Sequence, residues 1–258
     1  MMMGKICVEL VSRLGNQMFE IANGYHLSKL HRKEFVLKES TTRCTFPYVR
    51  YDCIFKNPKF KFITNTYNFK IFQEPSNQGR VDFKDVGRYD NVLIRGFYQS
   101  SIYFDRKDAE ELFPIPNEIK DKYSYLNDKV CISVRRGDYL KYGNMFIVPP
   151  IQWYEKCYDK YFSGKDVVIA SDDIEWCKKS FTFKNQEFIV NDNPMETIYI
   201  KSMCKNHIMP PSTFSWWSAY LADAKTIVPS DWVGEALKRT KFNEEDKYVE
   251  GWIREPIE

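Results

Sequence analysis

The sequence has few of the residues that bind metal ions or build disulfide frameworks. Its 258 residues include three histidines, and none lies at ligand spacing from another histidine or a cysteine, which argues against a zinc site. The seven cysteines form no C-x-x-C pair, and an odd number cannot all pair within one chain. We therefore expect free, buried thiols, as in proteins of a reducing compartment such as the cytoplasm.

Long apolar runs and an excess of one charge are also absent. No stretch reaches the roughly 20 apolar residues of a membrane span, and the N-terminus has no apolar run long enough for a signal peptide. The formal net charge is +3 and the lysines are scattered, so the composition does not favour nucleic acid as a partner. We expect a cytoplasmic protein with, at most, peripheral contact with a membrane.

The N-terminal part of the chain predicts a β–turn–α–β unit. A strand is expected at Lys5–Leu10, a tight turn at 11–16, a helix at about 17–32 and a second strand at Phe35–Leu37. This order is typical of a Rossmann-like half. The aromatic, lysine-rich segment Thr41–Phe72 has no clear period, and we expect loops and short helices there. A strand at 92–94, a helix at 102–113 and a helical connector at 117–127 are expected to follow.

From residue 130 onwards, strands and helices alternate with short turns between them. This alternation predicts a parallel sheet covered by helices. We place the boundary between two α/β domains near residue 127, so that the domains span 1–127 and 128–258. The expected strands are 130–134, 167–170, 188–190, 208–209 and 226–228, and the expected helices are 151–162, 195–205 and two that end near residues 180 and 222.

The first chemical signal is Arg135-Arg136-Gly137-Asp138, at the end of the strand 130–134. Side chains alternate along a strand, so both arginines can share a target only at its frayed carboxyl end, where open α/β sheets bind ligands. Two guanidinium groups there suit a doubly charged group such as a diphosphate. An Arg–Asp salt bridge on a surface turn is the alternative interpretation.

Two further strand ends carry polar clusters, and a parallel sheet would bring all three to one edge. The run from Ser212 to Ser215 precedes a helix, where its hydroxyls can cap the helix or hold a phosphate at the positive helix end. Asp172 and Asp173 follow Ser171, and either can be an N-cap. A carboxylate is also the natural acceptor for the adjacent N1–H and N2 amine of guanine.

The sequence contains three short blocks: Arg13-Leu14-Gly15-Asn16-Gln17-Met18-Phe19, Ser133-Val134-Arg135-Arg136-Gly137-Asp138-Tyr139 and Ser212-Thr213-Phe214-Ser215-Trp216-Trp217. They resemble the signature blocks of glycosyltransferase family 11, the α-1,2-fucosyltransferases. The resemblance implies a GT-B fold, in which two Rossmann-like domains with parallel sheets face each other across a cleft. It also implies inverting, metal-independent transfer of L-fucose from GDP-L-fucose to the 2-hydroxyl of a terminal galactose, without a cofactor, by a bacterial-type enzyme.

The resemblance also implies roles for single residues, with the N-terminal domain on the acceptor side and the C-terminal domain binding the donor. Arg135 and Arg136 match the arginine pair that contacts the donor diphosphate. Asp172-Asp173 resembles the acidic turn that binds guanine. The remaining matches are Ser212, Thr213, Phe214 and Ser215 at the phosphate-binding helix start, and Gly15 and Asn16, with Arg13 beside them, in the loop that faces the diphosphate across the cleft.

Two positions depart from the family pattern. Ser133 stands where the central motif usually has a histidine that contacts the donor, which puts part of the guanosine contact in doubt. Ser12 stands where a glycine is common in the N-terminal turn. A dinucleotide-binding G-x-G-x-x-G is therefore absent, which argues against an NAD enzyme.

The residues also allow a mechanism to be outlined. Fucosyl transfer builds negative charge on the leaving diphosphate, and the sequence has no Asp-x-Asp pair for a metal clamp. We therefore expect Arg135 and Arg136 to offset the charge, helped by Asn16 and residues 212–215. Asp138 is either the catalytic base or a residue that orients the arginines, and the sequence does not decide between these roles.

The acceptor is the least defined partner. The resemblance implies a galactose-terminated glycan or a lipid-linked oligosaccharide. Three interpretations of the segment 41–72 stay open: it lines the acceptor side, it touches a membrane surface, or it is a solvated loop. Two other functions stay open: transfer of another GDP-linked sugar, and non-catalytic binding of a nucleotide or glycan on the same scaffold.

Overall fold

The computed structural model describes residues 4–40 and 48–257. The chain divides into two compact units, Met1–Pro114 and Ile115–Glu258. The division comes earlier than the predicted boundary at residue 127, because α4 (Asn117–Lys122) and the 3-10 turn η3 (Ser124–Leu126) belong to the second unit. Their buried residues Ile119 and Leu126 pack with the second sheet, so the connector is part of that core.

The first unit is a four-stranded parallel sheet in the order β2-β1-β4-β3. The predicted β–turn–α–β opening is confirmed, with β1 (Lys5–Leu10), α1 (Leu14–His31) and β2 (Glu34–Glu39). The strand β3 (Lys70–Gln73) falls where loops and short helices were expected, and residues 41–47 of that segment lie outside the described residues. The other elements are α2 (Asp52–Phe55), η1 (Val86–Arg88), β4 (Asn91–Arg95), η2 (Ser101–Tyr103) and α3 (Arg106–Leu112).

The second unit is a six-stranded sheet in the order β10-β9-β8-β5-β6-β7, again with every pair parallel. Counted from β5, this is the 3-2-1-4-5-6 strand order of a Rossmann fold. The predicted α/β class, with two parallel-sheet units, is therefore confirmed. The strands are β5 (Val130–Val134), β6 (Val167–Ser171), β7 (Gln186–Ile189), β8 (Asn206–Ile208), β9 (Lys225–Pro229) and β10 (Ile253–Glu255).

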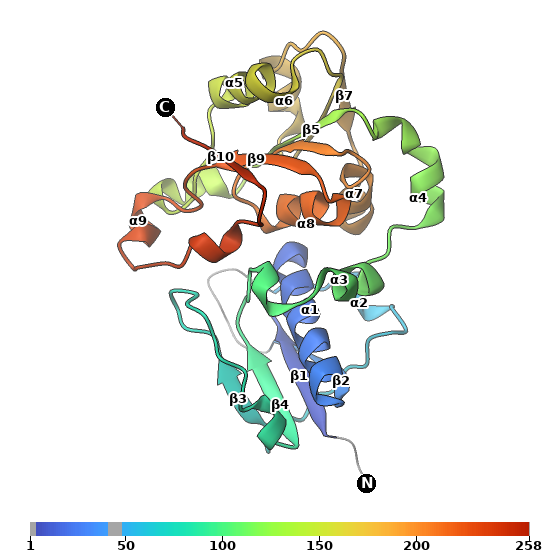
Figure 1. Ribbon diagram of the computed structural model, residues 1–258, viewed down its shortest axis with the longest axis vertical. Helices are drawn as coiled ribbons and strands as arrows, with labels where there is room; N and C mark the ends of the chain where they lie inside the picture. Colours follow the sequence, from blue (N-terminus) through green and yellow to red (C-terminus); the bar gives the residue numbers. More distant parts are fainter. Residues whose placement is uncertain (1–3, 41–47, 258) are drawn as a thin grey trace. The chain divides into compact units, whose positions relative to one another are not determined.

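Helices cover both faces of the second sheet (Figure 1). Alternate residues of β5 account for this, since Val130 and Ile132 pack with Trp153 on one face, whereas Cys131 packs with Ile200 on the other. The helices and 3-10 turns are η4 (Tyr139–Lys141), η5 (Gly143–Met145), α5 (Ile151–Phe162), α6 (Ile174–Ser180), α7 (Pro194–Lys201), α8 (Thr213–Ala222), α9 (Glu235–Lys238) and η6 (Glu245–Lys247).

In each sheet the strand order reverses at one place, and a ligand site is expected beside that place. In the first sheet, β1 lies between β2 and β4; in the second, β5 lies between β6 and β8. Ligands of open α/β sheets bind outside the carboxyl ends of strands at such a reversal. The loops that follow β1 and β5 are the ones that carry the first two sequence blocks.

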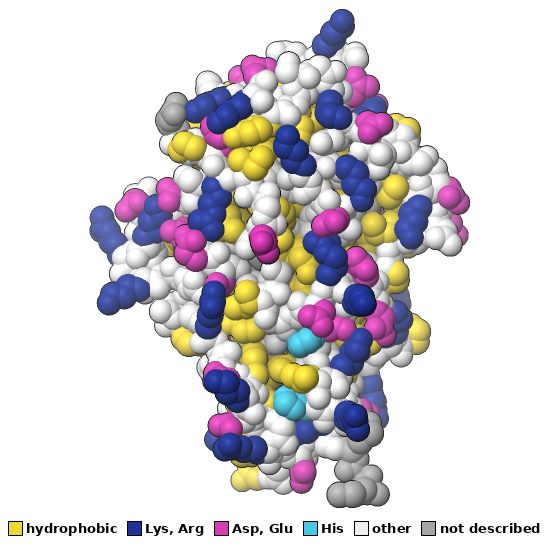
Figure 2. Space-filling view, in the orientation of Figure 1, with side chains coloured by type: hydrophobic (Ala, Val, Ile, Leu, Met, Phe, Trp, Pro, Cys, Tyr) yellow, Lys and Arg dark blue, Asp and Glu magenta, His cyan; other side chains and the backbone are white. Residues whose placement is uncertain are grey.

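The surface and the cysteines agree with the composition. Lys and Arg side chains are interspersed with Asp and Glu on the face shown in Figure 2. Six cysteines are free, five of them buried, as expected; Cys44 lies outside the described residues. Among the described residues, the structure has no helix with the length and apolar character needed to span a membrane.

Candidate functional site

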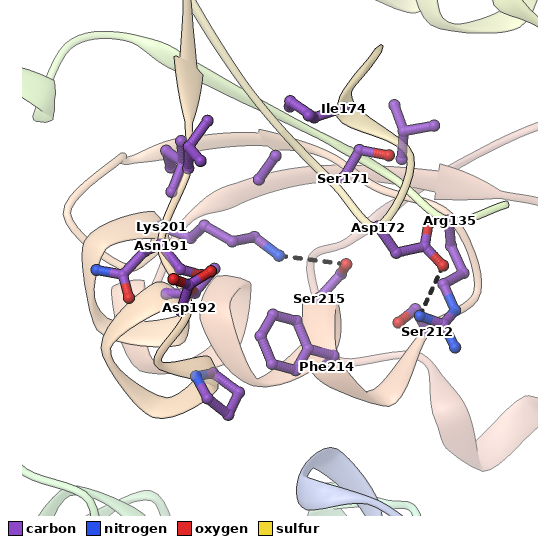
Figure 3. A pocket seen from close by; sticks show the side chains of 16 residues that line it. Arg135, Ser171, Asp172, Ile174, Asn191, Asp192, Lys201, Ser212, Phe214 and Ser215 are labelled. Atoms are coloured by element: carbon purple, nitrogen blue, oxygen red, sulfur yellow. Dashed lines mark hydrogen bonds and ion pairs between the residues drawn. The ribbon is translucent and has the colours of Figure 1, made fainter. Parts of the chain in front are cut away.

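A pocket of about 360 Å³ lies at the carboxyl edge of the second sheet. Val134 of β5 pairs with Ser171 of β6, so the residues that follow the two strands leave the sheet at the same level. The pocket is lined from the ends of β5, β6 and β7, from one face of α7 and from the start of α8 (Figure 3). The predicted site residues among its lining are Arg135, Asp172, Ser212, Phe214 and Ser215.

Arg135 is held by two carboxylates at this edge. Its Nη1 lies 2.8 Å from Oδ2 of Asp172, and its Nη2 pairs with Oδ1 of Asp138. The guanidinium also lies over the ring of Tyr139, 5.3 Å from its centroid. Because several contacts fix the side chain while it lines the pocket, its remaining donors have a defined direction.

Arg136 has different partners, as alternation along the strand requires. Its Nε donates to Oδ2 of Asp173 at 3.2 Å, and its guanidinium carbon lies 3.8 Å from the centroid of the Trp176 ring. The Arg136 side chain is not among the residues that line the pocket, whereas its backbone N–H donates to Oδ1 of Asp172 at 2.9 Å. Of the two arginines, only Arg135 lines the pocket, so joint contact of both with one ligand stays a prediction.

The acidic turn after β6 separates into two roles. Asp173 is the N-cap of α6, because its side chain accepts a hydrogen bond from the backbone N–H of Trp176 at 3.3 Å. Asp172 instead lines the pocket and holds both Arg135 and the backbone of Arg136. The N-cap interpretation thus applies to Asp173, and Asp172 is the carboxylate that faces the pocket.

Gly137 permits the close approach of Asp172. A Cβ at position 137 would lie 2.4 Å from Oδ2 of Asp172, the oxygen that pairs with Arg135. We expect Gly137→Ala to displace this carboxylate and loosen Arg135. Since the displaced atom is the end of a flexible side chain, the free energy of unfolding should change by less than about 1 kcal/mol.

The expected functional effect of Gly137→Ala is a loss of about tenfold in kcat/KM, which corresponds to about 1.4 kcal/mol. Steady-state kinetics with the donor substrate measures it. Asp172→Ala is the matched variant, and the double variant should lose little more than Asp172→Ala alone, because Gly137 acts only through this carboxylate. Independent, additive losses would contradict this coupling.

The start of α8 presents its free backbone donors beside the same pocket. Ser212 is the N-cap residue, but its side chain makes no capping hydrogen bond. Ser212 and Ser215 are both buried and line the pocket together with Phe214 (Figure 3). The first N–H groups of a helix carry partial positive charge and bind anions well. Thr213 belongs to the same helix start but is not among the lining residues.

Sequence reasoning missed part of the pocket. Asn191 and Asp192, after β7, and Lys201, the last residue of α7, all line it. Lys201 is 2% exposed, and burial lowers its pKa to about 8. Lys201 lies inside the predicted helix 195–205, on the same face as Lys205, and nothing in the sequence marked it as the buried one of the two. Asn191 and Asp192 follow the strand predicted at 188–190, which in the structure is β7 (Gln186–Ile189), but they were not recognised as a fourth polar strand end.

The first sequence block lies at the carboxyl edge of the first sheet. Ser12 has φ 59°, a left-handed conformation that explains why a glycine suits this turn. Arg13 is the N-cap of α1, and Gly15 is buried in its first turn. The Asn16 side chain donates to Oγ of Ser12 at 3.0 Å and accepts from Nε2 of Gln99, which follows β4, at 2.9 Å. The predicted position of this loop, facing a donor bound to the other unit, stays a prediction.

Ser133 lies on the face of β5 opposite to Val134. It is 1% exposed, its Oγ lies 4.0 Å from Sγ of Cys131, and it is not among the residues that line the pocket. A direct contact between Ser133 and a donor therefore stays a prediction. Asp138, also outside the lining, pairs with Arg135, as an orienting residue would, and the choice between this role and that of the base stays a prediction.

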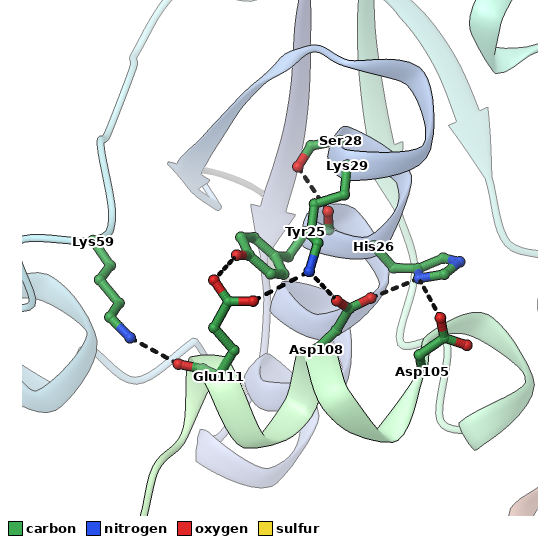
Figure 4. A network of polar contacts seen from close by, with 8 residues as sticks. All are labelled: Tyr25, His26, Ser28, Lys29, Lys59, Asp105, Asp108 and Glu111. Atoms are coloured by element: carbon green, nitrogen blue, oxygen red, sulfur yellow. Dashed lines mark hydrogen bonds and ion pairs between the residues drawn. The ribbon is translucent and has the colours of Figure 1, made fainter.

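A second polar cluster lies in the first unit, between α1 and α3 (Figure 4). His26, Asp105 and Asp108 offer ligand atoms within 4.8 Å of one another, so their types would suit a metal ion. Asp108 is nevertheless engaged already, by Nδ1 of His26 at 2.7 Å and by Nζ of Lys29 at 2.6 Å. With this ammonium on the carboxylate, the cluster is an ion-pair network that joins two helices.

Comparison with known proteins gives matches along nearly the whole chain. The model of the family described as Glycosyl transferase family 11 matches residues 2–256. An α-1,2-colitosyltransferase of Escherichia coli is 26% identical, with 98% of this chain and 99% of the relative covered. Galactoside 2-α-L-fucosyltransferase Sec1 of Mus musculus is 27% identical, with 97% of this chain and 73% of the relative covered.

Solved structures share the fold at much lower identity. The fucosyltransferase NodZ from Bradyrhizobium, in crystals grown with GDP, matches with a TM-score of 0.51 at 12% identity, over 84% of this chain and 92% of its own. A family 9 glycosyltransferase of Veillonella parvula matches with a TM-score of 0.51 at 10% identity, over 88% of this chain and 81% of its own. These likenesses concern the fold alone.

Proposed function

Because the chain belongs to glycosyltransferase family 11, we propose that it transfers L-fucose from GDP-L-fucose to the 2-hydroxyl of a terminal galactose on a glycan. The transfer inverts the anomeric carbon and needs no metal ion. The observation that carries the proposal is the pocket at the edge of the second sheet, where Arg135, held by two carboxylates, and the start of α8 line one cavity.

The diphosphate is the part of the donor that this pocket suits best. Arg135 supplies a fixed cation, and Ser212 and Ser215 supply hydroxyls beside the free N–H groups of α8. As the bond to fucose breaks, negative charge grows on the leaving diphosphate, and these preorganised donors stabilise it. Arg136, held on Trp176 and Asp173, adds positive charge at the neighbouring position of the chain.

Guanine is proposed to bind through the carboxylates of the pocket. Each carboxylate oxygen of Asp172 accepts one contact, from Arg135 or from the backbone of Arg136. Each oxygen keeps a second lone pair that can accept another hydrogen bond. Asp172 can therefore accept from the N1–H and N2 amine of guanine, with Asp192 at the end of the neighbouring strand. Uracil lacks this pair of adjacent donors, so the pocket should favour GDP over UDP.

Asp138 is proposed as a positioning residue rather than the base, because it pairs with Arg135. In the other unit, the loop of Arg13, Gly15 and Asn16 is proposed to complete the donor site. The acceptor is proposed to be a galactose-terminated glycan or lipid-linked oligosaccharide.

Transfer of a related sugar is the second candidate function. The relative from Escherichia coli that aligns over almost its full length is an α-1,2-colitosyltransferase. The same diphosphate and guanine contacts would serve GDP-linked colitose, since the two donors differ only in the sugar.

The test is a transfer assay in EDTA with GDP-L-fucose and, in parallel, GDP-colitose, using a β-galactoside as acceptor. We expect an α-1,2-linked fucosyl product, identified by NMR spectroscopy. Efficient transfer of colitose without transfer of fucose would contradict the fucosyltransferase proposal and favour the second candidate, a colitosyltransferase. Activity that disappears in EDTA and returns with a divalent cation would contradict the metal-independent mechanism.

A further inference from the structure

Lys201 is a buried cation in the wall of the proposed donor pocket. It ends α7, is 2% exposed and lines the pocket. Its Nζ lies 3.3 Å from Oγ of Ser215 and 5.1 Å from the centroid of the Phe214 ring (Figure 3). Within the part of the chain that the structure describes, no carboxylate forms an ion pair with this ammonium.

This placement is unfavourable for the fold by itself. An ammonium loses its hydration on burial, and only a paired negative charge would offset the loss. Ser215 and Phe214 belong to the first turn of α8, whose dipole places partial positive charge near Lys201. Burial accordingly lowers the pKa of Lys201 to about 8. A buried cation beside a positive helix end is stabilised when an anion enters the pocket.

The direction of the hydrogen bond indicates how Lys201 reaches that anion. An ammonium has three donors and no acceptor, so Ser215 Oγ must accept from it. The hydroxyl hydrogen of Ser215 is then free to donate elsewhere, and Ser215 itself lines the pocket. A neutral amine could accept from Ser215 instead and would turn this hydrogen away from the ligand.

We propose that Lys201 is a positioning residue of the nucleotide-sugar site: its ammonium holds Ser215 as a hydrogen-bond donor to the diphosphate and adds positive charge beneath the start of α8. The inference rests on the proposed function, since it assumes a diphosphate in this pocket. It extends that function, because it assigns a role to a residue outside the three sequence blocks.

This role implies that GDP affinity depends on the protonation of Lys201, so the other titratable groups nearby have to be considered. The thiols of Cys131 and Cys204 interact electrostatically with Lys201, and the hydrogen bond with Cys204 lowers the pKa of Cys131. A pH dependence that persists in Lys201→Met would therefore belong to Cys131 rather than to Lys201. His207 stays neutral above pH 7, because burial lowers its pKa to about 3. The other charged groups that line the pocket are Arg135, Asp172 and Asp192. The terminal phosphate of GDP loses its second proton with a pKa near 6, so its ionisation is complete well below pH 8.

The test measures GDP affinity by calorimetry at pH 7 and pH 9 for the parent protein and Lys201→Met. A bound diphosphate raises the pKa of Lys201, so the parent Kd should increase about tenfold between these pH values as Lys201 loses its proton in the free protein. Lys201→Met should bind GDP about tenfold more weakly at pH 7. Its Kd should lack the extra pH dependence, although the ligand's own titration is common to both proteins.

A stability measurement separates this role from a structural one. Because the folded pKa of Lys201 lies below its value of 10.5 in the unfolded chain, the buried charge destabilises the fold at pH 7, and stability should rise as pH increases from about 8 to 10.5. Lys201→Met should therefore raise the Tm of the ligand-free protein by a few degrees while it weakens GDP binding. A residue that mainly supports the fold would lower Tm instead.

Ser215→Ala completes the design. It should weaken GDP binding at pH 7, and Lys201→Met in that background should cost less than in the parent, because the part of the Lys201 effect that passes through Ser215 is already lost and only the charge effect remains. Parent-like affinity or an unchanged pH slope in Lys201→Met would overturn the role of Lys201 while leaving the donor site intact. A parent protein that binds no GDP at either pH would overturn the proposed donor, and the role of Lys201 with it.

Discussion

Arg135→Ala is expected to lower kcat by about 10²–10³, the effect of removing one preorganised donor worth roughly 2.7–4 kcal/mol in a transition state. Arg135 is the arginine that lines the pocket, and Asp172 and Asp138 fix its guanidinium from two sides. Its loss would leave the growing charge of the diphosphate without its nearest cation. Single-turnover kinetics with GDP-fucose separates this effect from a loss of binding.

Arg136→Ala is the matched control, because it removes the same charge from the adjacent residue. Arg136 stacks on Trp176 and pairs with Asp173, away from the pocket lining. We expect a smaller loss, and a loss below about tenfold would exclude direct contact between Arg136 and the diphosphate. A larger effect at Arg136 than at Arg135 would contradict the arrangement described above.

Glu74→Ala is expected to lower the free energy of unfolding by about 2–6 kcal/mol. The Glu74 side chain, 6% exposed, accepts from the backbone N–H groups of Phe97 at 2.6 Å and Tyr98 at 3.0 Å. Each buried donor left without an acceptor costs about 1–3 kcal/mol. The turn also needs Gly96, with φ +141°, where a Cβ would lie 2.3 Å from Cβ of Glu74.

The Glu74 prediction also concerns function, since this turn leads to Gln99, the residue that holds Asn16. Urea unfolding followed by circular dichroism measures the stability. Glu74→Gln keeps one acceptor oxygen and should lose less than Glu74→Ala. Equal losses in the two variants would mean that packing, rather than the hydrogen bonds to Phe97 and Tyr98, explains the effect.

The fold could be predicted where the pattern of residues is regular. The strand at 130–134 and the helix at 151–162 have the predicted bounds, because both have clear apolar periodicity. The strands β3 and β10 were missed, since both are short edge strands. In addition, the sequence of β3 has no alternation of apolar and polar residues. The unit boundary was misplaced because contacts of α4 with distant strands, not its own sequence, assign it to the second unit.

The site could be predicted only as a set of strand ends. Arg135, Asp172 and Ser212 follow parallel strands, so their meeting at one sheet edge follows from topology alone. The different positions of Arg135 and Arg136 depend on a stack with Trp176, which lies far along the chain. Lys201 could not be assigned, because a lysine inside the predicted helix 195–205 is usually solvated.

The most direct test of the nucleotide site is calorimetric titration of GDP in buffer with EDTA, with UDP as the control. We predict binding of GDP without metal, clearly weaker binding of UDP, and loss of GDP affinity in Arg135→Ala. Failure to bind GDP, or equal affinity for UDP, would contradict the assignment of the pocket as the site for the donor.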